Sequence, residues 1–230
     1  MLEDALRYPL NNDDRLATLV IGGLLLAFSF LIVPVFVLQG YLVRVLRSAA
    51  EGEEAALLHG LGALIVDGLK LIVVGLVYGF AIAVPFVVAT FVVGIGGATG
   101  SEAGLAAFGI VGVLLFLVAT VVAILVTYLL PAALTNFALE GRIGAAFDVS
   151  AITEATLSSK YLIGVLLGVV LNAVIGTVAG PLVFLLVGIP LLFYGQVVSY
   201  YCFARGFAEA TGRSGRGGVD TARTTPTDTL

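Results

Sequence analysis

The sequence predicts an all-α protein, a polytopic transmembrane helical bundle, from its composition and from the placement of its charges. Of the 230 residues, 60% are hydrophobic and only 11% are charged, whereas a soluble domain carries about 25% charged residues. The charges are also segregated, which leaves four charge-free windows at residues 16–43, 71–101, 103–139 and 161–204. Each window exceeds the roughly 20 apolar residues needed to cross a bilayer. Because the last window is long enough for two crossings, we expect at least five full spans.

One face of the last window supports this prediction, because small or polar residues recur there at every fourth position: Gly164, Gly168, Asn172, Gly176 and Gly180. Residues with this spacing stay on one side of a helix. In water, so much glycine would cost roughly 1 kcal/mol per residue relative to alanine. In lipid, backbone hydrogen bonds have no competitor, and a glycine face lets another helix approach closely. We therefore predict a helix-packing face here and a second one at Gly75, Gly79 and Ala83.

Short interfacial amphipathic helices are predicted before three of the spans. Residues 1–10 place charges among leucines and alanines and end in a proline, a pattern typical of a short helix on the membrane surface. Apolar residues at helical spacing in 57–67, with His59 and Asp67 on the opposite face, predict a second interfacial helix that runs into the next window. Residues 143–159 show a weaker pattern of the same kind.

The path of the first window stays open from the sequence alone. Pro34 interrupts it, so it forms either one kinked, tilted span or a re-entrant hairpin bent near Pro34, which would give six spans. The last window is expected to break near residues 176–181, and its second span to kink at Pro190. Residues 1–210 would then form a single transmembrane domain. Residues 211–230 contain almost no hydrophobic residue and are predicted to be a disordered tail.

Basic residues predict the orientation of the bundle. Arginine and lysine flank the loops on one side and are frequent in the tail, whereas residues 94–102 and 176–181 contain neither. Because basic residues favour the cytoplasmic side, we expect a multi-pass protein of the cell membrane with a cytoplasmic C-terminus. The side of the N-terminus depends on the unresolved path of the first window.

The sequence offers little machinery for catalysis. Cys202 is the only cysteine and His59 the only histidine, so no disulfide, thiolate metal site or paired-histidine metal site is signalled. No charged residue lies within a predicted span, which is where proton relays and voltage sensors need one. We therefore expect no enzyme activity, no cofactor, no metal and no nucleic-acid partner.

Neutral polar residues are the remaining candidates for function. Asn172 lies centrally in its predicted span on the glycine face, where it makes either an interhelical hydrogen bond or a polar contact in a substrate cavity. Four tyrosines near the charged boundaries are predicted to be interfacial anchors. They are Tyr41, Tyr161, Tyr200 and Tyr201.

Several short motifs resemble those of a known family. They are Glu3-Asp4-Ala5-Leu6-Arg7-Tyr8-Pro9, Ile21-Gly22-Gly23, Gly40-Tyr41-Leu42-Val43-Arg44-Val45-Leu46-Arg47, Asp67-Gly68-Leu69-Lys70 and, after Glu140-Gly141-Arg142, Ala145-Ala146-Phe147-Asp148. Over residues 1–212 the chain resembles the archaeal family of uncharacterised integral membrane proteins, common in haloarchaea and methanogens, that is classed as domain of unknown function 4013. The resemblance implies a membrane location and an archaeal source, and a salt-loving source would fit the net charge of −4. It transfers no catalytic residue.

Two function hypotheses follow. The first is a structural or accessory membrane protein that packs with lipids, with a membrane-protein partner or with a second copy of itself through its glycine faces. The second is a permease or channel-like protein for a neutral or amphipathic solute, with Asn172 in its cavity. Because charges are absent from the predicted spans and helix-packing patterns are frequent, the sequence favours the first.

Overall fold

The computed structural model describes residues 1–11, 15–54, 58 and 60–213. Within these ranges the chain is helical and contains no β-strand, so the predicted all-α class is confirmed for them. In chain order the elements are α1 (Leu2–Arg7), the 3₁₀ helix η1 (Tyr8–Leu10), α2 (Arg15–Ala27), α3 (Ile32–Glu51), α4 (Leu61–Ala98), α5 (Glu102–Glu140), the 3₁₀ helix η2 (Ile143–Phe147), α6 (Val149–Thr156), α7 (Ser159–Leu182), the 3₁₀ helix η3 (Val183–Leu185) and α8 (Gly188–Ala210).

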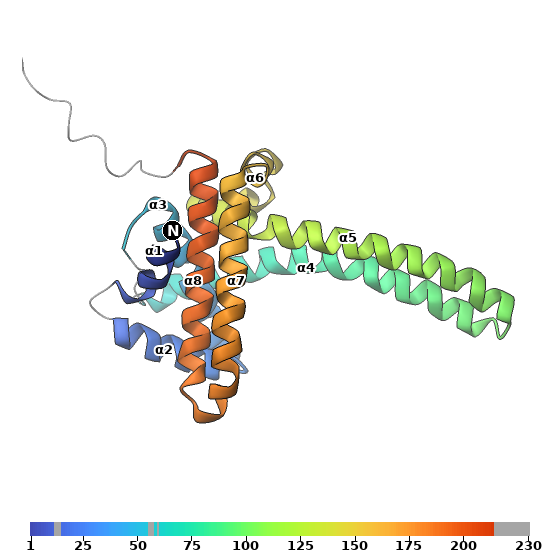
Figure 1. Ribbon diagram of the computed structural model, residues 1–230, viewed down its shortest axis with the longest axis horizontal. Coiled ribbons are helices and arrows are strands. Elements are labelled where there is room, and N and C mark those ends of the chain that lie inside the picture. Colours follow the sequence, from blue (N-terminus) through green and yellow to red (C-terminus); the bar gives the residue numbers. More distant parts are fainter. Residues whose placement is uncertain (12–14, 55–57, 59, 214–230) are drawn as a thin grey trace, which may run out of the picture.

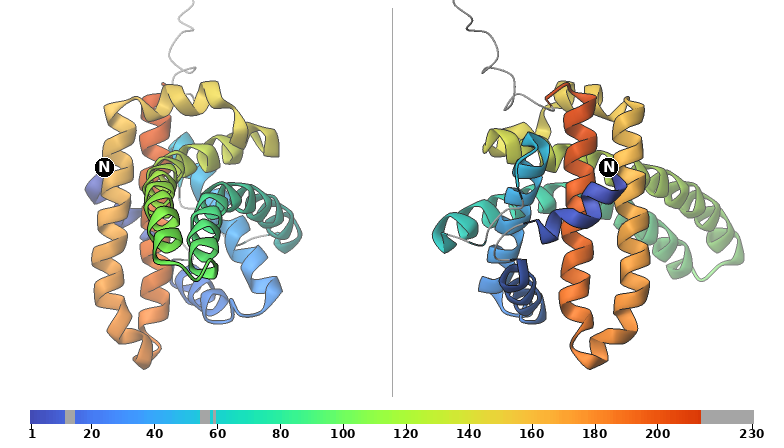
Figure 2. Two further views of the ribbon diagram at one scale, coloured as in Figure 1. Left: turned by 90° about the vertical axis from the view of Figure 1, so that its right-hand side faces the viewer. Right: turned by 60° about the vertical axis from the view of Figure 1, so that its left-hand side comes forward.

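Two long helical hairpins give the molecule its shape. The hairpin of α7 and α8 lies against α1, α2 and α3, and the hairpin of α4 and α5, here called the arm, projects away from it (Figures 1 and 2). Helix α3 contacts α4, α5 and α8, so it joins the arm to the rest of the protein. The arm helices contain 38 and 39 residues. At 1.5 Å per residue they are roughly 57 Å and 59 Å long, about twice the thickness of a bilayer's hydrocarbon core.

Four helices are long and apolar enough to cross a membrane: α3, α4, α5 and α7 with its extension η3. This finding indicates a multi-pass membrane protein, but it does not confirm the predicted count of five or six spans. The predicted fifth span corresponds to α8, which has 23 residues and is not one of the four. Helix α8 carries Gln196, Ser199 and Arg205, which lower its hydrophobicity.

The first window forms two helices with a break at residues 28–31, and not at Pro34. Helix α2 has 13 residues and is about 20 Å long, too short to cross a bilayer. Pro34 is the third residue of α3, where a missing backbone N–H costs nothing because the first turn has no acceptor for it. Of the two alternatives that the sequence left open, two helices agree better with the hairpin than with one kinked span, but the bend lies before the proline.

The last window also breaks later than predicted. Helix α7 continues through the residues where the break was expected and ends at Leu182, and the chain turns at residues 183–187. Leu186 adopts a left-handed conformation there, with φ 59°. Pro190 lies in the first turn of α8 and so does not kink that helix.

The predicted interfacial helices are found in part. The N-terminal one consists of α1 and η1, and the third of η2 and α6. In the second one, Leu57 and His59 lie outside the described residues, and from Leu61 onward it is the beginning of α4, continuous with the span. In the predicted tail, residues 211–213 follow α8, and residues 214–230 lie outside the described part of the chain.

Part of the glycine face packs α7 against α8. A Cβ atom added at Gly164 would lie 2.7 Å from the carbonyl oxygen of Cys202 and 2.8 Å from Cα of Gly206. At Gly168 it would lie 3.0 Å from the carbonyl oxygen of Ser199, whose hydroxyl donates a hydrogen bond to the Gly168 carbonyl. These distances leave no room for a side chain, so glycine permits the close approach of the two backbones.

We predict that Gly164→Ala lowers the thermal unfolding midpoint in detergent, because its methyl group would overlap the α8 backbone. Overpacking of this kind costs about 1–3 kcal/mol. Gly176→Ala is the matched control, since a Cβ atom at Gly176 meets nothing within 4 Å. It is expected not to lower the midpoint. Equal midpoints, measured by circular dichroism, would contradict this account of the interface.

Candidate functional site

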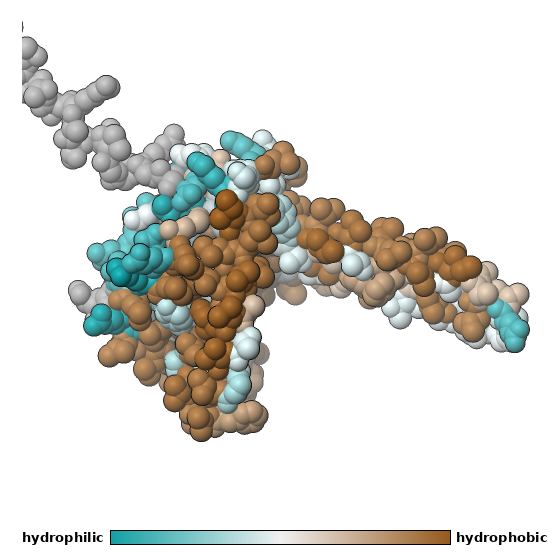
Figure 3. Space-filling view, in the orientation of Figure 1, coloured by the Kyte–Doolittle hydropathy of each residue, from teal (hydrophilic) through white to brown (hydrophobic). Residues whose placement is uncertain are grey.

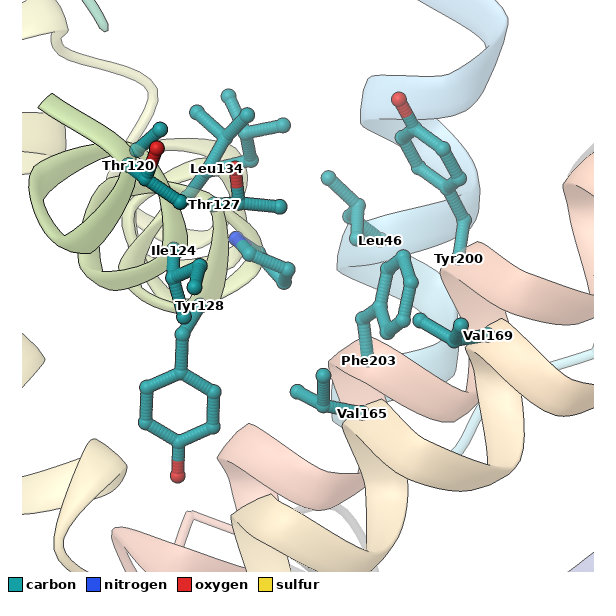
Figure 4. Close-up of a pocket in the computed structure, with 13 residues that line it drawn as sticks. Leu46, Thr120, Ile124, Thr127, Tyr128, Leu134, Val165, Val169, Tyr200 and Phe203 are labelled. Carbon is teal, nitrogen blue, oxygen red and sulfur yellow. The ribbon is translucent and has the colours of Figure 1, made fainter. Parts of the chain in front are cut away.

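An apolar cavity of about 540 Å³ lies in the angle where the arm leaves the body of the protein. We call it the elbow cavity. Figure 4 shows side chains of α5 on one wall and side chains of α3, α7 and α8 on the other. The lining residues are Leu46, Thr120, Ala123, Ile124, Thr127, Tyr128, Leu130, Pro131, Leu134, Val165, Val169, Tyr200 and Phe203. The volume falls within the range of about 300–1,000 Å³ that is usual for small-molecule sites.

The lining of the elbow cavity is almost entirely apolar and uncharged. It contains no acidic, basic or histidine side chain. Two of its hydroxyl groups are directed to backbone acceptors: Thr120 donates to the carbonyl of Phe116, and Tyr128 donates to the carbonyl of Thr156 at 2.7 Å. The cavity therefore presents mainly hydrocarbon, which suits an apolar ligand.

A second cavity, of about 470 Å³, adjoins the first on the other side of α5. Leu130, Leu134 and Tyr200 line both cavities. Gly75 and Gly79, the second predicted packing face, lie in its wall on α4. A Cβ atom at either glycine would meet nothing within 4 Å. Within the described part of the chain this glycine face is thus directed into an open cavity and packs against no helix.

A buried hydroxyl group fixes α5 beside the elbow cavity. Pro131 lies inside α5, and the next residue, Ala132, donates its N–H to the hydroxyl of Tyr161 at 3.0 Å. The same hydroxyl donates to the carbonyl of Tyr128 at 2.7 Å. In a regular helix the Ala132 N–H and the Tyr128 carbonyl would bond to each other. The Tyr161 hydroxyl is therefore inserted into the α5 hydrogen-bond ladder at the proline, a recognised cause of a helix kink.

Basic side chains from other elements hold the C-terminal end of α5. Arg47 donates from Nε to the Ala138 carbonyl at 2.7 Å, and Lys70 donates from Nζ to the Gly141 carbonyl at 3.3 Å. Carbonyl groups at a helix C-terminus carry partial negative charge and attract cations. Arg213, beyond α8, donates to Oδ1 of Asn136 at 3.1 Å. Side chains from α3, α4 and the end of α8 thus converge on the base of the arm.

Comparison with known proteins identifies the family. The family described as "Protein of unknown function (DUF4013)" matches residues 24–199. The chain belongs to the DUF4013 family. No curated protein and no solved structure matches it. The match confirms the resemblance drawn from the sequence motifs, and it extends from α2 to α8, so it includes the arm and nearly all of the elbow cavity. Helix α1 and η1, which carry the N-terminal motif, lie outside the matched residues.

In this DUF4013 protein the structure separates the predicted site residues. Gly164 and Gly168 lie at the contact of α7 with α8, whereas a Cβ atom at Gly176 or Gly180 would meet nothing within 4 Å. Asn172 is exposed on α7, and neither the elbow cavity nor the adjoining cavity includes it. Its Oδ1 atom lies 3.3 Å from the position of a Cβ atom at Gly195 on α8.

Two tyrosines were assigned the wrong role by the sequence analysis. Tyr161 and Tyr41, predicted to be interfacial anchors, are 0% and 1% exposed. Tyr161 is inserted into α5, and the ring of Tyr41 packs on Phe193 with centroids 5.5 Å apart. Their closeness in sequence to charged residues was misleading, because both rings are buried inside the protein. The only sequence signal for the role of Tyr161 is Pro131, which removes a backbone donor from α5.

We predict that Tyr161→Phe destabilises the protein and increases the range of directions that the arm adopts relative to α7. Loss of the inserted hydroxyl leaves a buried N–H and a buried carbonyl to find new partners, at a cost of about 1–3 kcal/mol. Spin labels at Val113 on α5 and Val178 on α7, both exposed, should show a broader distance distribution by double electron–electron resonance in the variant.

The control for this prediction is Tyr194→Phe, which removes a hydrogen bond from Tyr194 to the carbonyl of Leu6, far from the arm along the chain. It should leave the distance distribution unchanged. If Tyr161→Phe also left the distribution unchanged, the inserted hydroxyl would not set the direction of the arm.

Proposed function

We propose that this member of the DUF4013 family is a non-enzymatic structural or accessory protein of the cell membrane. It would act by packing with membrane lipids and with a membrane-protein partner or a second copy of itself. The observation that carries the proposal is the arm, whose surface is apolar and largely uncovered by the rest of the protein (Figure 3). The apolar elbow cavity, which lacks catalytic groups, is consistent with it.

Large apolar side chains on both helices of the arm are exposed. On α4, Phe80, Val87 and Phe91 are 66%, 66% and 70% exposed. On α5, Ile110 and Leu117 are 66% and 56% exposed. Exposure of a continuous apolar surface of this size is unfavourable in water and marks a membrane or protein contact. We infer that lipid and a partner chain cover the arm in the membrane.

Basic residues indicate how the protein is oriented in the membrane. Arg47, Lys70, Arg142 and Arg213 lie near the base of the arm, and the loop at its tip, between α4 and α5, contains no basic residue. Because positively charged segments favour the cytoplasm, we place the base of the arm and the C-terminus on the cytoplasmic side.

A permease is the second candidate, and the observation that favours it is the pair of cavities beside Pro131, since broken helices also build transport sites. Transport of a polar solute has less support, because Asn172 does not line either cavity.

Cysteine labelling in intact membranes tests whether lipid surrounds the arm. In a Cys202→Ala background we compare Leu117→Cys on α5 with Leu157→Cys, which lies between α6 and α7 and is 88% exposed. Maleimide reacts with the thiolate, which forms in water and not in hydrocarbon. We expect rapid labelling at position 157 and none at position 117 until the membrane is dissolved. Equal labelling at the two positions in intact membranes would refute the proposal.

Solute flux separates the two candidates. Liposomes that contain the purified protein should release a panel of neutral and amphipathic solutes no faster than empty liposomes if the protein is accessory. Val169→Phe, which narrows the elbow cavity, is compared with Val170→Phe, at an exposed position outside it. Flux that the first variant abolishes and the second preserves would overturn the accessory proposal in favour of a permease.

A further inference from the structure

A polar pocket of about 430 Å³ lies away from the elbow cavity, between α1, η1, the C-terminal end of α3 and α8. Four charged side chains line it: Asp4, Arg7, Glu53 and Arg205. Tyr8 and Tyr201 line it as well. It lies in the part of the molecule around α1 where hydrophilic residues gather (Figure 3). Neither the arm nor the elbow cavity uses any of these residues.

The pocket lies where a candidate span ends. Helix α3 is apolar enough to cross a membrane, and the pocket begins just beyond its last residue, at Gly52 and Glu53. Leu2 and Leu10 on α1 and η1 are 51% and 42% exposed, as expected for a short helix that rests on the hydrocarbon boundary. Tyrosine is enriched at this depth because its ring is apolar and its hydroxyl is polar. With α3 across the membrane, as the proposed role requires, the pocket would lie at the level of the lipid headgroups.

Aromatic contacts fix the walls of the pocket. The rings of Tyr8 and Tyr201 are in contact, with centroids 4.6 Å apart. The Tyr8 hydroxyl and the Ser48 hydroxyl on α3 share a hydrogen bond of 2.6 Å. Tyr194 of α8 donates to the carbonyl of Leu6. Helix α1 is thus attached to both α3 and α8, so its charged residues are held over the pocket before any ligand binds.

The charges of the pocket are balanced between two signs. Arg7 pairs with Glu3 at 2.8 Å on the surface, and Arg205 lies 3.6 Å from Glu209. A guanidinium has five N–H donors, so one contact of this length leaves most of the Arg205 donors for a ligand. The Met1 amino group, hydrogen bonded to Asp4, lowers the pKa of that carboxyl, and Arg205 adds to the lowering. The pocket therefore presents two guanidinium groups and two carboxylates.

We propose that this pocket binds the headgroup of a zwitterionic phospholipid, a phosphodiester that also carries an amine. The phosphate accepts hydrogen bonds from Arg7 and Arg205, as planar guanidinium groups favour, and the amine lies beside the carboxylate of Glu53. An anionic headgroup without an amine would leave the Glu53 carboxylate of the pocket facing a like charge. The inference rests on the proposed membrane-embedded role, and it adds a defined lipid to it.

Native mass spectrometry of the delipidated, detergent-solubilised full chain tests this. Phosphatidylethanolamine and phosphatidylglycerol with identical acyl chains are added in turn. We expect the wild type to retain the zwitterionic lipid at least fivefold better. Arg205→Gln and Arg7→Gln should each weaken its binding about tenfold, the effect of one lost charge-assisted contact. Glu53→Gln should reduce the preference between the two lipids.

Arg142→Gln is the matched control, because Arg142 is an exposed arginine paired with Glu140 outside the pocket. It should bind like the wild type. Arg7 is 76% exposed, so Arg7→Gln is expected to fold. It therefore tests the proposal even if Arg205→Gln does not fold. Unchanged binding in Arg7→Gln, or no preference for the zwitterionic lipid, would overturn the proposal. Displacement of the lipid by millimolar soluble phosphoethanolamine would instead assign the pocket to a soluble phosphate ester.

The labelling experiment on the arm is independent of this result. If position 117 is labelled in intact membranes, the proposed membrane role fails whatever lipid the pocket retains. If position 117 is protected and the headgroup preference is absent, the membrane role stands and only the pocket assignment fails.

Discussion

The base of the arm is held by a hydroxyl group inserted into α5, together with the packing of α3 on both arm helices. Pro131 cannot donate a backbone hydrogen bond, and the Tyr161 hydroxyl joins the Ala132 N–H to the Tyr128 carbonyl across the same turn. Because Tyr161 is fully buried at the start of α7, this contact links the arm to the α7–α8 hairpin. The basic side chains Arg47 and Lys70 then hold the end of α5 a short distance further along. The elbow cavity is the space left between the elements that these contacts join.

The two sites have opposite chemistry, and this contrast fits a protein embedded in a bilayer. The elbow cavity is lined by hydrocarbon at the root of helices that can cross a membrane, whereas the polar pocket lies at the end of α3 and is lined by charges of both signs. Lipid molecules have the same division into tails and headgroups. The proposed headgroup site and the proposed lipid contact of the arm would thus lie at different depths of the membrane.

Residue patterns predicted some contacts well and others poorly, for a physical reason. Glycine at every fourth position predicts a helix-packing face, and Gly164 and Gly168 do lie against α8. The same pattern at Gly176 and Gly75 has no helix against it, because spacing defines a face and not its neighbour. Prolines were misread as bends at Pro34 and Pro190, since a proline in the first turn of a helix removes no hydrogen bond. Tyr161 was misread as an anchor, because its partners, the Ala132 N–H and the Tyr128 carbonyl, belong to a different helix that the residues around Tyr161 do not indicate.

The helical, multi-pass character can be predicted from the chain alone, because hydrophobic length and charge placement are properties of the sequence. The short motifs likewise indicate the DUF4013 family. The break of the first window before its proline, the projection of the arm from the body and the pocket of Asp4, Arg7, Glu53 and Arg205 become visible in the folded structure. These features join residues as much as 201 positions apart, from Asp4 to Arg205. The contacts behind these features form only when separate helices pack together. The residue spacing within one helix therefore does not predict them.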